Sequence, residues 1–196
     1  MQACLLAASD LSCRRGDRVL FRGLSFALAS GEALQIAGSN GIGKSSLIRM
    51  LAGLLRPFSG TVSHTGEIGL VDERPALDPH QPLGKALEFW AAMDGVSPVE
   101  GDAIAARLGL SNLLDVPFRY LSTGQRKRAA LARLIGQGAS IWLLDEPLNG
   151  LDTAAVQLVE TLVADHCRAG GIALVASHQP IAIPGARRIE LAEHAA

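Results

Sequence analysis

The sequence has few lysines, few aromatic residues and no surplus of positive charge. Lysine occurs three times in 196 residues, 4% of the residues are aromatic, and the formal net charge is -1. This balance gives no bulk attraction to nucleic acid and no polybasic signature for a membrane surface. We therefore expect no nucleic-acid partner and no direct electrostatic docking on lipid.

Cysteine is also scarce, and its spacing does not suit pairing. The three cysteines are odd in number, far apart and outside the CxxC pattern: Cys4, Cys13 and Cys167. The sequence therefore predicts neither a disulfide framework nor a zinc site, and it favours a reducing compartment.

Long apolar runs are missing as well. No run approaches the roughly 18 apolar residues that a membrane-spanning helix needs. The N-terminal residues lack the basic start of a signal peptide. If the protein works at a membrane, we expect it to do so through a partner. The length and the 48% hydrophobic content predict one α/β domain over residues 1–196.

The sequence does contain an alternation of apolar strands and amphipathic helices. Residues 5–11 and 24–28 are predicted strands, and residues 33–38 form a short apolar run that a helix follows. Two short runs after that helix, 61–63 and 67–71, are predicted to pair as a hairpin.

The middle of the chain differs in character. Prolines recur from about residue 74 to 121, where two helices are expected at 83–93 and 100–108. After residue 122 the predicted elements are a helix, a strand at 139–145, a helix at 153–168, and strands at 172–177 and 188–191. This order predicts a helical insertion in an α/β core whose apolar strands suit a parallel sheet.

The segment GSNGIGKSS holds the motif G-x-x-x-x-G-K-S between an apolar strand and an amphipathic helix. Its glycines let successive N–H groups turn toward one anion, and the helix N-terminus adds partial positive charge. The lysine of this motif reaches the β- and γ-phosphates, and the following hydroxyl ligates Mg²⁺. The predicted ATP-binding residues of this phosphate loop are Gly38, Ser39, Asn40, Gly41, Ile42, Gly43, Lys44, Ser45 and Ser46.

An acidic pair follows the apolar run IWLLD. The strand should deliver Asp145 to the carboxyl end of the sheet, where ligands gather in open α/β folds. Asp145 and Ser45 are predicted to hold Mg²⁺, partly through water, and Glu146 to orient or deprotonate the attacking water. In isolation such a pair would better suit a solvated turn or a helix cap, but its place after a buried strand, in a chain with the phosphate loop, favours the catalytic interpretation. His178 follows the run IALVAS, so a contact with the γ-phosphate is predicted.

The stretch YLSTGQRKRAALAR is predicted to begin a helix, with Ser122 or Thr123 as its cap. Basic residues follow directly, and helix N-termini favour anions. The stretch does not itself identify the anion.

The motifs GSNGIGKSS, LSTGQRKR, LLDEP, NGLD and ASH occur in the order found in ATP-binding-cassette (ABC) ATPase subunits, which the chain resembles over nearly its whole length. The resemblance implies a P-loop NTPase fold with a mixed or parallel sheet core, an N-terminal antiparallel part and a short helical insertion. It also implies a sandwich dimer, in which the signature segment of one copy contacts ATP held by the other. The carried-over residues are Leu121, Ser122, Thr123, Gly124 and Gln125 of the signature segment, and Asp152 of NGLD.

A narrower resemblance rests on LSCRRGDRVLFRGLSFAL, GLLRPFSG and KALEFWAAM. These segments are similar to the ATPase subunit of the haem exporter in bacterial cytochrome c maturation. The resemblance implies a peripheral protein on the cytoplasmic face of the inner membrane, bound to integral membrane subunits. It further implies that hydrolysis drives haem export or release of the loaded haem chaperone.

Two positions depart from the common ABC pattern. Arg15 stands where an aromatic residue usually stacks on adenine, and its guanidinium can stack on a base or be a solvated charge. Glu73 stands where most ABC ATPases carry a glutamine that contacts Mg²⁺ and transmits the nucleotide state. We expect Glu73 to keep a coupling role and to add little ATP affinity, since a carboxylate repels the γ-phosphate.

Other functions are weighed against the transport ATPase. Repair ATPases interrupt the domain with long coiled coils, and this interval has no heptad run. Translation ATPases carry two cassettes, and a non-hydrolysing regulatory cassette would lack Lys44, Asp145 or Glu146. Another ABC exporter and a soluble ABC ATPase outside transport stay as alternatives. The remaining histidines are scattered without a CxxCH motif, so no direct haem binding is expected: His64, His80, His166 and His194.

Overall fold

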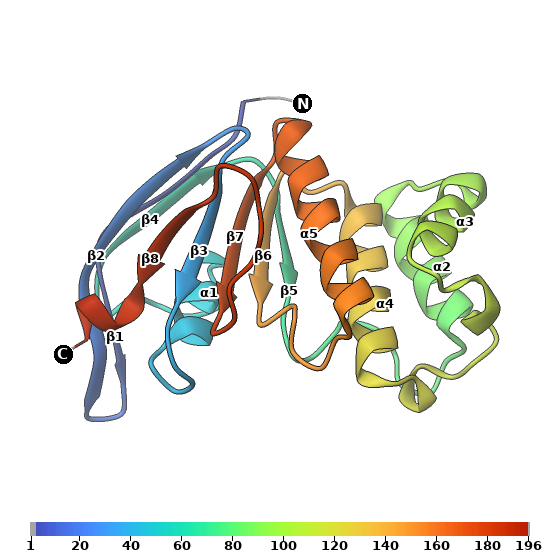
Figure 1. Ribbon diagram of the computed structural model, residues 1–196, viewed down its shortest axis with the longest axis horizontal. Coiled ribbons are helices and arrows are strands. Elements are labelled where there is room, and N and C mark those ends of the chain that lie inside the picture. Colours follow the sequence, from blue (N-terminus) through green and yellow to red (C-terminus); the bar gives the residue numbers. More distant parts are fainter. Residues whose placement is uncertain (1–2, 196) are drawn as a thin grey trace.

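The computed structural model describes residues 3–195 and contains two sheets (Figure 1). Three strands form an antiparallel sheet in the order β2-β1-β4, and five form a parallel sheet in the order β5-β6-β7-β3-β8. The two sheets lie side by side, and the helical insertion lies at the opposite end of the molecule from the antiparallel sheet. The predicted α/β fold with an antiparallel N-terminal part is confirmed.

The antiparallel sheet is built on one long hairpin. β1 (Leu5–Arg15) and β2 (Arg18–Ala29) pair through a turn that places Arg15 opposite Arg18. β4 (Ser59–Thr65) lies on the other side of β1. From Leu24 to Ala29, alternate residues of β2 are buried, as expected for a sheet with one face on the core.

The parallel sheet carries the strands that lead to the predicted site. β3 (Ala33–Ala37), β6 (Ile141–Asp145) and β7 (Ile172–Ser177) are buried at every residue. β5 (Ile68–Val71) and β8 (Arg187–Glu190) form the edges and are less buried. Because the strands are parallel, their carboxyl ends meet at one edge of the sheet.

Helices cover the two faces of the parallel sheet. α1 (Lys44–Leu51) lies between the two sheets in one apolar core. α4 (Thr123–Gln137) and α5 (Thr153–Arg168) cover the other face (Figure 1). α2 (Leu83–Asp94), α3 (Pro98–Arg107) and short 3-10 turns at Ser111–Leu113, Phe118–Tyr120 and Leu191–His194 complete the elements.

The predicted hairpin of residues 61–63 and 67–71 is wrong. β4 pairs with β1 and β5 pairs with β6, so the two runs belong to different sheets. The local pattern is misleading because Gly66, at a φ of 112°, does make a turn between them. At Gly66 the main chain lies against Ser140, since a Cβ on Gly66 would be 2.4 Å from Ser140 Oγ.

The first helix is shorter than its apolar periodicity suggests. α1 ends at Leu51, although leucines at helical spacing continue to Leu55. Gly53 adopts a φ of 72°, and the amides of Leu54 and Leu55 both donate to Arg49 O, which closes the helix. A glycine in the left-handed region is a common helix stop.

Within residues 3–195, no helix combines the length and the apolar character needed to cross a membrane. The helices predicted at 83–93 and 100–108 correspond to α2 and α3, which pack on α4. The single-domain boundary of 1–196 stays a prediction.

Candidate functional site

The phosphate loop joins β3 to α1. Gly43 is the N-cap of α1 at a φ of 121°, where L side chains are strained. A Cβ there would lie 3.1 Å from Phe21 Cδ1 and 3.3 Å from Leu20 Cβ on β2. No side chain caps α1, and its first turn carries no acidic residue. Its N-terminal amides are therefore available to an anion.

Lys44 is buried beneath this loop. Its Nζ donates to Gly38 O at 2.7 Å and to Ser39 O at 3.1 Å. The same Nζ lies 3.0 Å from Glu146 Oε1. That oxygen has no hydrogen bond of acceptable geometry to the described residues, so its attraction to Lys44 is ionic. The ammonium thus both holds the loop and faces the acidic residue that follows β6.

Asp145 ends β6 and is buried. Its Oδ1 has no hydrogen-bond partner within residues 3–195. Burial raises the pKa of Asp145, the Glu146, Glu73 and Asp72 carboxylates raise it further, and a hydrogen bond from the Ser45 hydroxyl opposes the rise. A buried carboxylate oxygen without a donor, beside a serine hydroxyl, fits a hard cation such as Mg²⁺.

Glu146 is held between two cationic or donor groups. Its Oε1 faces Lys44, and its Oε2 lies 2.9 Å from Nδ1 of His178 at the end of β7. Burial by itself would raise the pKa of Glu146, but its interactions with Lys44 and His178 lower that pKa below its usual value. The carboxylate is therefore ionised at neutral pH, as a proton acceptor must be. The structure brings the predicted Lys44, Glu146 and His178 together.

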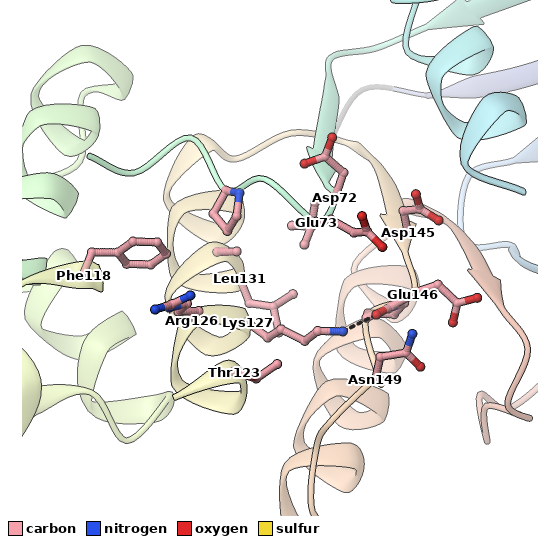
Figure 2. Close-up of a pocket in the computed structure, with 14 residues that line it drawn as sticks. Asp72, Glu73, Phe118, Thr123, Arg126, Lys127, Leu131, Asp145, Glu146 and Asn149 are labelled. Atoms are coloured by element: carbon pink, nitrogen blue, oxygen red, sulfur yellow. Dashed lines mark hydrogen bonds between the residues drawn. The ribbon is translucent and has the colours of Figure 1, made fainter. Parts of the chain in front are cut away.

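Glu73 lies beside the acidic strand ends in a cavity of about 320 Å³ (Figure 2). The cavity separates the ends of β5 and β6 from α4 and the insertion. The charge of Glu73 contributes to the raised pKa of Asp145, so the Glu73 and Asp145 carboxylates lie within electrostatic range of each other. Glu73 therefore lies between the acidic strand ends and the helical insertion.

The signature segment begins α4, and its own residues cap that helix. Ser122 Oγ accepts from the Gln125 amide at 3.3 Å, and Gln125 Oε1 accepts from the Ser122 amide at 2.8 Å. This capping box confirms Ser122 as the cap. Thr123 and Gly124 follow in the first turn, and Leu121 is buried.

The signature segment opens on a groove of its own. The groove has a volume of about 600 Å³ and is lined by Ser122 to Gln125 and by Asp152, but by no residue of the phosphate loop. Asp152 caps α5, with its Oδ1 2.8 Å from the Ala155 amide. The structure thus groups Asp152 with the signature segment and separates both from the phosphate loop of the same chain.

Arg15 lies exposed at the end of β1. Burial raises the pKa of the neighbouring Cys13 thiol, against the effects of the Ser46 hydroxyl and the Arg15 charge. Arg15 is therefore within electrostatic range of Cys13, on the antiparallel sheet. Adenine stacking by Arg15 stays a prediction.

Two residues of this region escaped the sequence analysis. Lys127 of α4 donates from Nζ to the Glu146 carbonyl, whereas the sequence showed only a basic helix face. Gln35, buried in β3, donates to Gln179 O at 2.7 Å and so anchors the segment after His178. A polar residue inside an otherwise apolar strand was the available signal for Gln35. The available signal for Lys127 was its spacing of four residues from Thr123, which puts both residues on one face of the helix.

A glycine loop on a helix N-terminus, with buried acidic residues at the end of a nearby parallel strand, is the phosphate and metal site of P-loop NTPases. The additional capped signature segment and the antiparallel sheet define, within that class, an ATPase of the ABC type.

Comparison with known proteins agrees. The ABC transporter family profile matches residues 21–149. The cytochrome c biogenesis ATP-binding export protein CcmA of Novosphingobium aromaticivorans is 56% identical over 191 residues, 97% of this chain and 97% of the relative. CcmA of Zymomonas mobilis is 55% identical, covering 89% of this chain and 78% of the relative. The chain belongs to the ABC transporter family and, within it, to the CcmA cytochrome c biogenesis ATP-binding export proteins.

Solved structures show the same fold. CbiO1 of Clostridium perfringens, part of the ABC transporter complex cbiONQ, matches with a TM-score of 0.73 and 27% identity, over 89% of this chain and 78% of that chain. An ABC transporter ATP-binding protein of Pyrococcus furiosus matches with a TM-score of 0.86 at 21% identity, over 98% of this chain and 100% of that chain. The chain is thus an ATP-hydrolysing subunit that works with membrane subunits of a transporter.

Proposed function

We propose that this ATPase drives the haem exporter of cytochrome c biogenesis, coupling ATP hydrolysis to haem export or to release of the loaded haem chaperone. The observation that carries hydrolysis is the cluster of Lys44, Glu146 and His178 at the strand ends. The biogenesis pathway is supported by the CcmA relatives, whose names state cytochrome c biogenesis and export. Haem as cargo is supported by the sequence resemblance, and the ATPase itself needs no haem ligand for this role.

In the proposed site, the amides of the phosphate loop and Lys44 bind the ATP phosphates. Ser45 and Asp145 would hold Mg²⁺, which when bound neutralises charge on the phosphates. Oδ1 of Asp145, which has no hydrogen-bond partner among residues 3–195, supports this assignment. Arg15 is proposed to stack on the adenine, from the exposed end of β1.

Glu146 is proposed to take the proton of the attacking water, since its carboxylate is ionised and held in place. His178 orients that carboxylate through Nδ1 and helps hold the γ-phosphate. Before this step, when ATP binds, Lys44 exchanges its ion pair with Glu146 for the phosphates.

A second copy of the chain is proposed to complete the site. The signature segment satisfies its own cap and faces a separate groove with Asp152. We infer that the groove closes on ATP bound by the phosphate loop of the other copy. Each sandwich would thus hold two ATP molecules at a shared interface.

The helical insertion and Glu73 are proposed to transmit the nucleotide state to integral membrane subunits. The cavity beside Glu73 lies between the hydrolytic strand ends and the insertion, which supports this route. We place the protein peripherally on the cytoplasmic face of the inner membrane, where ATP is available.

Complementation tests this function. Deletion of the gene should abolish holo-cytochrome c, and the wild-type chain should restore it. Glu146→Gln should fail to restore it, while Glu193→Gln, an exposed glutamate far along the chain, should succeed. Normal holo-cytochrome c in the deletion strain would instead favour another ABC exporter or a soluble ABC ATPase.

A further inference from the structure

The main chain of Glu146 has an unusual conformation. Within residues 3–195, Glu146 and Asp10 are the non-glycine residues at positive φ, and Glu146 has a φ of 48°. L residues seldom adopt this region, so surrounding contacts must hold it. The direction of the Glu146 side chain depends on this conformation, because it turns the chain between β6 and the segment that follows.

Both main-chain polar groups of Glu146 are anchored. Its amide donates to Ala176 O on β7 at 2.8 Å. Its carbonyl accepts from Nζ of Lys127, and from the Asn149 amide at a long 3.4 Å. Lys127 therefore supplies the closer contact on the carbonyl side.

Lys127 reaches this carbonyl from another element. Its side chain extends from α4 across the cavity to Glu146 (Figure 2). Burial lowers the pKa of Lys127, while the negative charges of Glu146, Asp145 and Glu73 oppose that change. A desolvated ammonium costs free energy unless it has partners. Here its partners are a carbonyl and a cluster of carboxylates.

We propose that Lys127 is a positioning residue for ATP hydrolysis, which fixes the left-handed main chain of Glu146 and so aims its carboxylate. This inference rests on the proposed role of Glu146 as the base. Lys127 acts through Glu146, because its Nζ donates to the main-chain carbonyl of that residue. It also lies one helical turn beyond Thr123, so movement of the signature end of α4 shifts the carbonyl that Lys127 holds.

The test is steady-state hydrolysis of MgATP by the full chain. Lys127→Met keeps much of the apolar stem and removes the donor. We expect kcat to fall about 10- to 100-fold, as small misplacements of a catalytic group do, with KM for ATP within about twofold. Lys127→Arg keeps a charged donor, and the adjoining cavity of about 320 Å³ has room for it. It should keep kcat within about threefold of wild type.

Arg126→Met is the matched control. Arg126 lines the same cavity one residue away, but its guanidinium donates to Arg119 O and does not contact Glu146. We expect its kcat to stay within about twofold of wild type. Unchanged kcat in Lys127→Met would overturn the proposal, as would an equal fall in Arg126→Met.

Two further comparisons keep the test decisive. If Lys127→Met does not fold, Lys127→Gln replaces it, because glutamine is too short to reach the Glu146 carbonyl. Equal kcat values for the Lys127→Gln and Lys127→Arg variants would then overturn the proposal. Glu146→Gln is assayed alongside. Loss of hydrolysis in Glu146→Gln with normal hydrolysis in Lys127→Met refutes the role of Lys127 alone. Normal hydrolysis in Glu146→Gln refutes the proposed base itself.

Discussion

The phosphate-loop end and the signature end of this protein satisfy their polar groups in opposite ways. At the first, Lys44, Asp145 and Glu146 are buried, and charged groups from separate strands and helices face one another. At the second, Ser122 and Gln125 bond only within one turn of their own helix and face an open groove. The first region is assembled by the fold of one chain. The second satisfies its own cap, and on the proposed function it acts only when ATP bound by another copy enters the groove.

The largest expected effect tests the first region. Glu146→Gln removes the proposed proton acceptor and the ion pair with Lys44. We expect hydrolysis to fall by about 10²- to 10⁴-fold. ATP affinity should rise, because Lys44 no longer has to leave a carboxylate. Phosphate release and size-exclusion chromatography with ATP will measure both. A variant that remains monomeric with ATP would contradict the sandwich dimer.

The next effect tests the second region. Gly124→Asp places a carboxylate where the groove should meet phosphate, and a Cβ at Gly124 comes no closer than 3.5 Å to Leu151 Cδ2, so the fold should tolerate it. We expect at least a roughly 100-fold loss of hydrolysis, with ATP binding by the phosphate loop within about twofold of wild type.

The matching variant Ser122→Arg should behave in the same way, apart from loss of the helix cap, which costs about 1 kcal/mol of stability. Equilibrium binding of a fluorescent ATP analogue separates the two regions. If binding and hydrolysis fall together, the signature segment is only a structural cap and the comparison fails.

A smaller effect is expected between the regions, at Glu73. Glu73→Gln removes one of the charges that raise the pKa of Asp145, and the Glu73 charge is a smaller influence there than burial or the Glu146 charge. We expect hydrolysis by the isolated chain to stay within about twofold, and holo-cytochrome c to decrease in cells. If both stay unchanged, Glu73 has no coupling role.

The smallest effect lies outside both regions. His166 stacks on Trp142 with ring centroids 4.0 Å apart, and burial lowers the pKa of His166 from 6.5. As pH falls, His166 therefore binds a proton in the unfolded chain before it does so in the folded chain. The contribution of neutral His166 to the free energy of unfolding is fully present above pH 6.5 and is lost as pH falls toward the folded pKa. Thermal melts of His166→Phe from pH 8 to pH 5 should show a weaker loss of stability than wild type. Its kcat should not change.

The sequence predicted the features that are encoded locally. The phosphate loop, β6, β7 and the capped start of α4 each depend on motifs a few residues long. The pairing of β4 with β1 was missed because strand partners distant in sequence leave no local mark.

The contact between Lys127 and Glu146 was missed for the same reason. The two residues are 19 positions apart on a helix and a strand end, and the cavity that joins them exists only after packing. Sequence reasoning therefore identified candidate reacting groups more readily than contacts between distant elements, such as that of Lys127 with Glu146.

The ion pair of Lys44 and Glu146 has a consequence for the timing of catalysis. While the pair persists, the low pKa of Glu146 makes its carboxylate a weak base. Phosphate that draws Lys44 away raises that pKa and strengthens the base. On the proposed roles, arrival of the substrate is what activates the group that will hydrolyse it. On these roles, Glu146 is a poor proton acceptor in the free enzyme and becomes an effective one only when ATP binds.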